Sequence, residues 1–117
     1  MSYVDGFVAA VPNANKQAFI EHAKYAAQIF KDHGALKVME NWGDNVPDGA
    51  LTSFPMAVKK KEDETVVFSW VIWPSKEAHE AGWEKIMADE RMAPENMKMP
   101  FDGKRIIFGN FETVLEA

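Results

Sequence analysis

Residues 65–73, T-V-V-F-S-W-V-I-W, constrain the fold more than any other stretch of this chain, because nearly every position is apolar. Such β-branched and aromatic residues favour a strand, in which successive side chains point to opposite faces of the sheet. A strand with one face in water alternates apolar and polar residues. Here one parity holds Val66, Phe68, Trp70 and Ile72, while Val67, Val71 and Trp73 dominate the other. The pattern therefore predicts a strand that is buried on both faces.

Two segments carry helical patterns. Phe19, Ala23, Ala26 and Phe30 recur at helical spacing, and a glycine follows at the position where a helix would end, so an amphipathic helix is predicted over residues 15–33. A second helix is predicted over residues 75–91, with Ser75 as its N-cap.

Strand patterns occupy most of the remaining chain. Besides residues 65–73, strands are predicted at 3–11, 36–42 and 105–115, and a further strand at 54–60, where Pro55 favours an edge position. The order β-α-β-(β)-β-α-β is that of an α+β, ferredoxin-like protomer, and we expect residues 1–117 to form one domain.

The number of helices bears on the assembly. Right-handed crossovers place both helices of such a protomer on the same face of the sheet. One chain can therefore cover one face only, whereas the 65–73 strand requires burial on both. We expect a second copy to pack sheet against sheet as a two-fold homodimer.

Composition and motifs exclude several classes of function. The formal net charge is −5, and the only arginines are Arg91 and Arg105, so we expect no nucleic-acid partner. The lysine run at residues 59–61 is followed by acidic residues 62–64, which indicates a charge-balanced, solvated turn. There is no cysteine, signal-peptide pattern, membrane-length apolar run or dinucleotide fingerprint, so we expect a cytoplasmic protein without a cofactor, disulfide or membrane contact.

Several motifs together resemble those of the DUF1428 family, a group of small YbaA-like bacterial proteins. These are Y-V-D-G-F at residues 3–7, W-G-D-N-V-P-D-G at 42–49, F-S-W at 68–70, P-S-K at 74–76 and M-P-F-D-G-K-R at 99–105. The resemblance covers essentially the whole chain. It implies a dimeric α+β barrel, with ferredoxin-like protomers paired through their sheets. The family has no established activity, so the resemblance implies no catalytic residues.

Three charged residues are candidates for a ligand pocket. Asp5 lies within a strand, where aspartate is depleted. It is an acid or base with a raised pKa beside a pocket, the partner of Arg105 or Lys104 in a salt bridge, or a residue exposed near the start of the strand. Lys104 and Arg105 would clamp an anionic substrate. The alternative is that Arg105 pairs with a carboxylate of the 40–49 loop.

The 40–49 loop and the methionines supply further candidates. Glu40 and Trp42 stand at the end of a predicted strand, where an aromatic ring and a carboxylate would face a ligand. The other polar residues of the loop suit turns. Met92, Met97 and Met99 would form an adaptable lid over an apolar pocket, or else fill a gap above the core.

The histidines offer little by themselves. His22 and His33 share a helix face but lie about 16 Å apart along it, and no metal-binding histidine spacing occurs, so we expect no metal site and no histidine base.

Two functions remain open. The first is a small-molecule binder or cofactor-free enzyme, with a pocket between the sheet, the helices and the 92–102 loop. The alternative is a non-catalytic homodimeric interaction module that uses the 40–49 loop.

Overall fold

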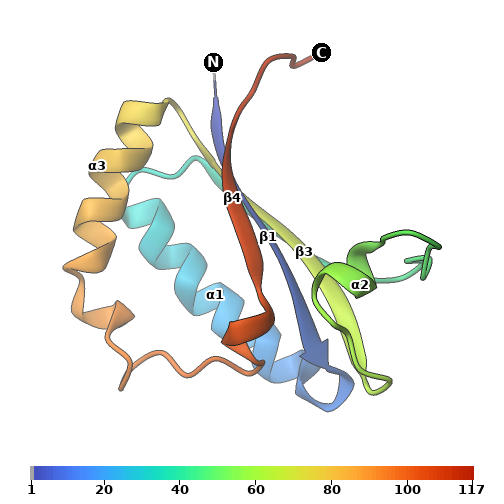
Figure 1. Cartoon of the computed structure of the whole chain (residues 1–117). Helices are drawn as coiled ribbons and strands as arrows, with labels where there is room; N and C mark the ends of the chain where they lie inside the picture. Colours follow the sequence, from blue (N-terminus) through green and yellow to red (C-terminus); the bar gives the residue numbers. More distant parts are fainter. Residues whose placement is uncertain (1) are drawn as a thin grey trace.

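A computed structural model describes residues 2–117, which fold into a four-stranded antiparallel sheet with helices packed against it (Figure 1). The strand order is β2-β3-β1-β4, which confirms the predicted α+β, ferredoxin-like topology. The strands are β1 (Tyr3–Pro12), β2 (Lys37–Trp42), β3 (Glu64–Trp73) and β4 (Ile107–Glu112). The helices are α1 (Lys16–Asp32), α2 (Phe54–Ala57) and α3 (Lys76–Met87), and the 3₁₀ turns are η1 (Asn13–Asn15), η2 (Glu90–Met92) and η3 (Gly103–Arg105).

The long central pair of strands determines which residues face the helices. β1 and β3 pair over ten positions, from Tyr3 opposite Trp73 to Pro12 opposite Glu64. Because side chains alternate along a strand, every second residue of β1, including Asp5, shares a face with Trp73. α1 and α3 both lie on one side of the sheet, as Figure 1 shows, in agreement with the handedness rule.

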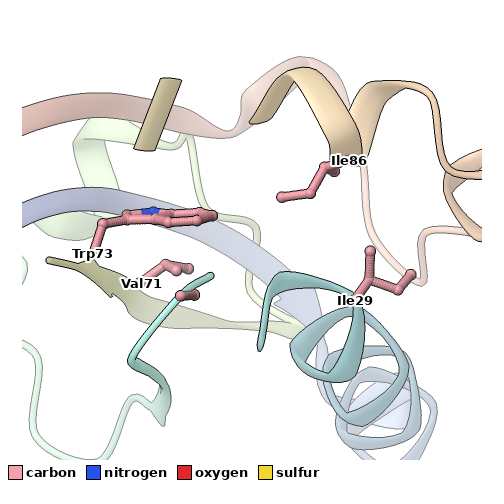
Figure 2. Close-up of a cluster of buried hydrophobic side chains, with 5 residues drawn as sticks. Ile29, Val71, Trp73 and Ile86 are labelled. Carbon is pink, nitrogen blue, oxygen red and sulfur yellow. The ribbon is translucent and has the colours of Figure 1, made fainter. Parts of the chain in front are cut away.

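The main core lies between this face and the two helices. Val71 and Trp73 from β3 meet Ile29 from α1 and Ile86 from α3, and all four side chains are buried (Figure 2). Gly82 of α3 allows the close approach of the helix to Trp73, since a Cβ atom there would lie 2.3 Å from the indole ring. A bulky aromatic residue and a glycine thus determine how closely α3 packs on the sheet.

The opposite face of the sheet is largely open. α2 and its flanking loop lie on this side (Figure 1), and Val58 packs against one end of β1 and β3 in a small buried cluster. Beyond that cluster, a shallow apolar hollow is lined by Val4, Phe68, Trp70 and Phe111, together with neighbouring backbone. Phe68 is 43% exposed and Phe111 59% exposed. The β3 strand is therefore apolar on both faces, yet the chain covers only one of them fully.

The strand predicted at residues 54–60 is wrong. Residues 54–57 form the short helix α2, and the Ser53 hydroxyl caps it by accepting a hydrogen bond from the Met56 amide at 3.1 Å. Pro55 occupies the first turn of this helix, where its missing N–H has no intrahelical partner to lose. Pro55, which favoured an edge strand in the sequence, thus stands at the start of a helix.

Three predicted element ends are also wrong. α3 ends at Met87, and residues up to 91 belong to a turn and to η2. Arg105 lies in η3, and β4 begins two residues later at Ile107 and ends at Glu112 instead of residue 115. The side chains of Asp89 and Asp102 start these two 3₁₀ turns by accepting hydrogen bonds from backbone amides. Hydrophobic periodicity in the sequence does not indicate such caps.

Candidate functional site

A cavity of about 210 Å³ lies between the sheet, α1 and the segment that follows α3. Its walls are mainly apolar and come from all three of these parts and from Trp83 of α3; they include Phe7, Phe19, Phe30, Val67 and Phe101. Met92, Met97 and Met99 also line it, so the structure brings the three predicted lid residues together at one wall. Glu40, Ser69 and His22 contribute polar groups to the lining. An apolar cavity with a few convergent polar groups is the usual form of a small-molecule site.

Glu40 and Ser69 meet because the strands place them opposite each other. They are register partners in the β2–β3 pair, and both side chains point to the helix-covered face. The Ser69 hydroxyl donates a hydrogen bond of 2.7 Å to one carboxyl oxygen of Glu40. Burial raises the pKa of the Glu40 carboxyl, and the hydrogen bond from Ser69 partly opposes this shift.

Glu40 stands where the cavity adjoins the surface. A groove of about 370 Å³ runs between α1 and β2, and Phe19, Ala23 and Glu40 line both the groove and the cavity. Trp42 lines the groove, where the Lys16 ammonium lies 5.3 Å from the centre of its ring. Glu40 is exposed as a residue, and its carboxyl group is partly buried where it accepts the Ser69 hydrogen bond. The geometry places Glu40 at the junction between groove and cavity.

Like Ser69, His22 is a polar cavity residue that was not predicted from the sequence. Its ring lies edge-on to Phe101, with 6.2 Å between the ring centres. Burial lowers the pKa of His22, and a hydrogen bond to the Lys98 backbone partly restores it. The signal was present in the sequence, because His22 directly precedes Ala23 and follows Phe19 by three positions on the apolar stripe of α1.

Asp5 lies outside this cavity lining, in a separate buried network. Its Oδ2 atom accepts hydrogen bonds from the indole N–H groups of Trp73 at 3.0 Å and Trp83 at 2.8 Å. Its Oδ1 atom lies 2.7 Å from Nε2 of His79 and accepts a second bond from the Asn110 amide. The predicted salt bridge to Arg105 or Lys104 is therefore wrong. Four donors satisfy both carboxyl oxygens, which is the arrangement of a structural buried acid.

Arg105 is also committed to a separate network. Its guanidinium forms two parallel hydrogen bonds to Glu64, at 2.7 and 2.6 Å, and a third to the Lys59 carbonyl oxygen at 2.9 Å. The predicted pairing with the 40–49 loop is wrong, and Glu64 is buried instead of belonging to a solvated turn. Arg105 lowers the pKa of Glu64 to about 2. Lys104 lies exposed beside it, and its backbone amide donates to Asp102.

The predicted site residues thus separate into four places. Glu40 and the three methionines meet at the cavity, Trp42 lies in the adjoining groove, and Asp5 and Arg105 belong to two other networks. Within residues 2–117, no cluster of three or more histidine, aspartate or glutamate side chains is arranged to hold a metal ion. None of the helices in this part of the chain is both long and apolar enough to cross a membrane.

Comparisons with known proteins agree with the fold and the motifs. The model of the family described as "Protein of unknown function (DUF1428)" matches residues 2–103. The "Uncharacterized protein YbaA" of Escherichia coli strain K12 is 53% identical over 116 residues, covering 99% of both chains, and the YbaA protein of Shigella flexneri gives the same values. A crystal structure described as a dimeric ferredoxin-like protein from an uncultured marine organism shares the fold. Its TM-score is 0.63 at 13% identity, over 99% of this chain and 98% of that one.

Proposed function

The chain belongs to the DUF1428 family, and we propose that it is a homodimeric protein whose protomers each bind a small, mainly apolar molecule in the cavity beside Glu40. The observation that carries this proposal is the Glu40 carboxyl group, which borders an otherwise largely apolar cavity and has a raised pKa. A carboxyl group with a perturbed pKa in a cleft is a typical feature of a functional site. Chemistry on the bound molecule would use the same carboxyl group and the nearby His22 imidazole.

The size and walls of the cavity support binding. An engineered apolar cavity of about 150 Å³ is large enough to hold benzene, and this one measures about 210 Å³. Three methionines contribute to one wall, and methionine adapts to irregular shapes because its side chain is unbranched and flexible. The groove beside Glu40 offers a route from solvent.

The open face of the sheet supports the homodimer. Val4, Phe68, Trp70 and Phe111 line an apolar hollow there, and large exposed apolar patches on soluble proteins mark interaction sites. The marine ferredoxin-like structure, which shares this fold, is described as dimeric. A second copy packed on this face would give β3 the burial on both sides that its sequence requires.

Ligand binding is tested by a screen of small apolar compounds against the full chain, followed by tryptophan fluorescence and thermal unfolding. Trp83 lines the cavity, so its emission should change on binding. Ala26→Leu adds bulk to the cavity wall and should remove the response, whereas Ala81→Leu on the exposed side of α3 should leave it unchanged. Circular dichroism verifies that both variants fold. If Ala26→Leu binds as well as the parent chain, the cavity is not the site.

The homodimer is tested by light scattering at micromolar concentration. We expect the mass of two chains for the parent protein and a shift toward one chain for Phe68→Glu, because the new charge would be buried in the interface. Met87→Glu, at an exposed position on the helix side, is the matched control. A parent protein with the mass of one chain would refute the dimer.

The alternative interaction module has less support. Trp42 packs against Phe19, with 6.1 Å between ring centres, and against Lys16, so its ring is already partly occupied within the chain. That alternative would replace the proposed function if the compound screen gave no response while Trp42→Ala abolished capture of a protein partner.

A further inference from the structure

We propose that the cavity selects a ligand by its hydrogen-bond donor: a small apolar molecule that carries one hydroxyl or amino group, with anionic molecules rejected. This inference rests on the proposed function, because it names the chemical class that the same cavity would take. The donor group would bind the carboxyl group of Glu40, and the apolar part of the ligand would lie between the aromatic and methionine walls.

The polar groups of the cavity act as acceptors. The Ser69 hydroxyl hydrogen is already directed at Glu40, so its oxygen offers lone pairs to a ligand. Burial lowers the pKa of His22 and so favours its neutral form, in which one ring nitrogen is an acceptor. The second carboxyl oxygen of Glu40 has no protein donor among the side-chain hydrogen bonds of residues 2–117.

Groups that would bind an anion are engaged elsewhere. No lysine or arginine belongs to the cavity lining in the described chain. The indole N–H of Trp83 is a further potential donor at the cavity wall, but it donates a hydrogen bond of 2.8 Å to Asp5. Two lysines line the adjoining groove: Lys16 lies over the ring of Trp42, and Lys24 pairs with Glu21 at 3.5 Å. An anion would therefore lose its hydration beside the Glu40 carboxyl group without gaining a cation.

A ligand that carries a donor should be preferred over the same ring without one. A donor that reaches the Glu40 carboxyl group gains a hydrogen bond, whereas a ring without a donor leaves the second carboxyl oxygen facing an apolar group. We therefore expect a donor-bearing ring to bind at least about tenfold more tightly than the same ring without a donor.

The test uses four matched single-ring probes: phenol, benzylamine, toluene and benzoate. Dissociation constants for the full chain are measured by calorimetry or by Trp83 fluorescence. Phenol or benzylamine should bind at least about tenfold more tightly than toluene, and benzoate should bind most weakly. The relative dissociation constants of phenol and benzylamine show whether the cavity prefers a neutral or a cationic donor.

Variants of Glu40 locate the preference. Glu40→Leu should abolish the advantage of the donor-bearing probes while toluene still binds, and the isosteric Glu40→Gln should reduce it. Glu84→Leu, on the exposed side of α3, should leave all four constants unchanged.

The outcomes separate this inference from the proposed function. Equal binding of toluene and phenol, or tightest binding of benzoate, would overturn the donor preference and leave small-molecule binding intact. A preference that survives in Glu40→Leu would overturn the role of Glu40. If none of the four probes binds the parent chain and the wider compound screen also fails, the proposed function itself fails.

Discussion

Replacement of Asp5 by alanine should destabilise this protein severely. The Asp5 side chain accepts hydrogen bonds from four donors that come from β3, α3 and β4. These elements are separated from Asp5 by 68 to 105 positions in the chain. The carboxyl group therefore joins the two central strands, one edge strand and a helix at a single buried point, and alanine would leave all four donors without their acceptor.

The size of the effect follows from the burial of the donors. The Trp73 and His79 bonds are buried, so those two donors cannot turn to water. Each buried donor left unsatisfied costs about 1–3 kcal/mol, which gives about 2–6 kcal/mol for the pair. Trp83 and Asn110 are partly buried and can recover part of their bonding from solvent. A loss of this size is a large share of the roughly 5–15 kcal/mol that stabilises a typical domain.

Urea unfolding followed by tryptophan fluorescence measures this loss. Parent and variant must be compared at one protein concentration, because dimerisation would make the apparent stability concentration-dependent. Asp44→Ala, at an exposed loop position, is the control and should stay within about 0.5 kcal/mol of the parent chain. The double variant Asp5→Ala/His79→Phe no longer contains the unpaired His79 donor. Its loss of stability should therefore be smaller than the sum of the losses of the two single variants. A loss below about 1 kcal/mol for Asp5→Ala would refute the reasoning.

Three further changes test other contacts. Glu64 has a folded pKa of about 2, below its ordinary 4.5, so its contribution is complete above pH 4.5 and is lost as pH falls toward 2. The complete loss is about 3 kcal/mol, of which about 2 kcal/mol falls between pH 7 and pH 3. Arg105→Ala should abolish most of this acid dependence in urea unfolding at pH 7 and pH 3. Gly82→Ala should lower the midpoint of thermal unfolding despite the better helix propensity of alanine, because the methyl group would meet Trp73; an unchanged midpoint would contradict the close packing. Ser75→Ala should cost about 1 kcal/mol through loss of the α3 N-cap, and a change below about 0.3 kcal/mol would show that the cap contributes little.

Most of the fold is readable from local patterns. The alternation and length of the apolar runs predicted all four strands of the sheet, and helical spacing predicted α1 and α3. α2 was missed because its four residues are too few to show a helical period, while the apolar Phe54 and Val58 and the intervening proline resemble an edge strand. The Ser53 cap followed by Pro55 was the available signal.

The candidate site was only partly predictable. Glu40 and the methionines were identified as pocket residues, and they line one cavity. Asp5 and Arg105 were recognised as unusual charges, but their partners were assigned wrongly, because His79 and Glu64 lie 74 and 41 positions away in the sequence. A charge in a strand shows that a partner is needed, whereas the register and the helix packing select which one.

Periodic patterns in the sequence predict the four strands of the sheet, the helices α1 and α3, and the apolar character of β3 on both faces, because these properties repeat along the chain every two or 3.6 residues. Which polar groups meet depends on the folded arrangement. The β2–β3 register places Ser69 opposite Glu40, and the packing of α3 brings His79 and Trp83 to Asp5. Such contacts depend on distances between segments remote in sequence, and no local period encodes those distances.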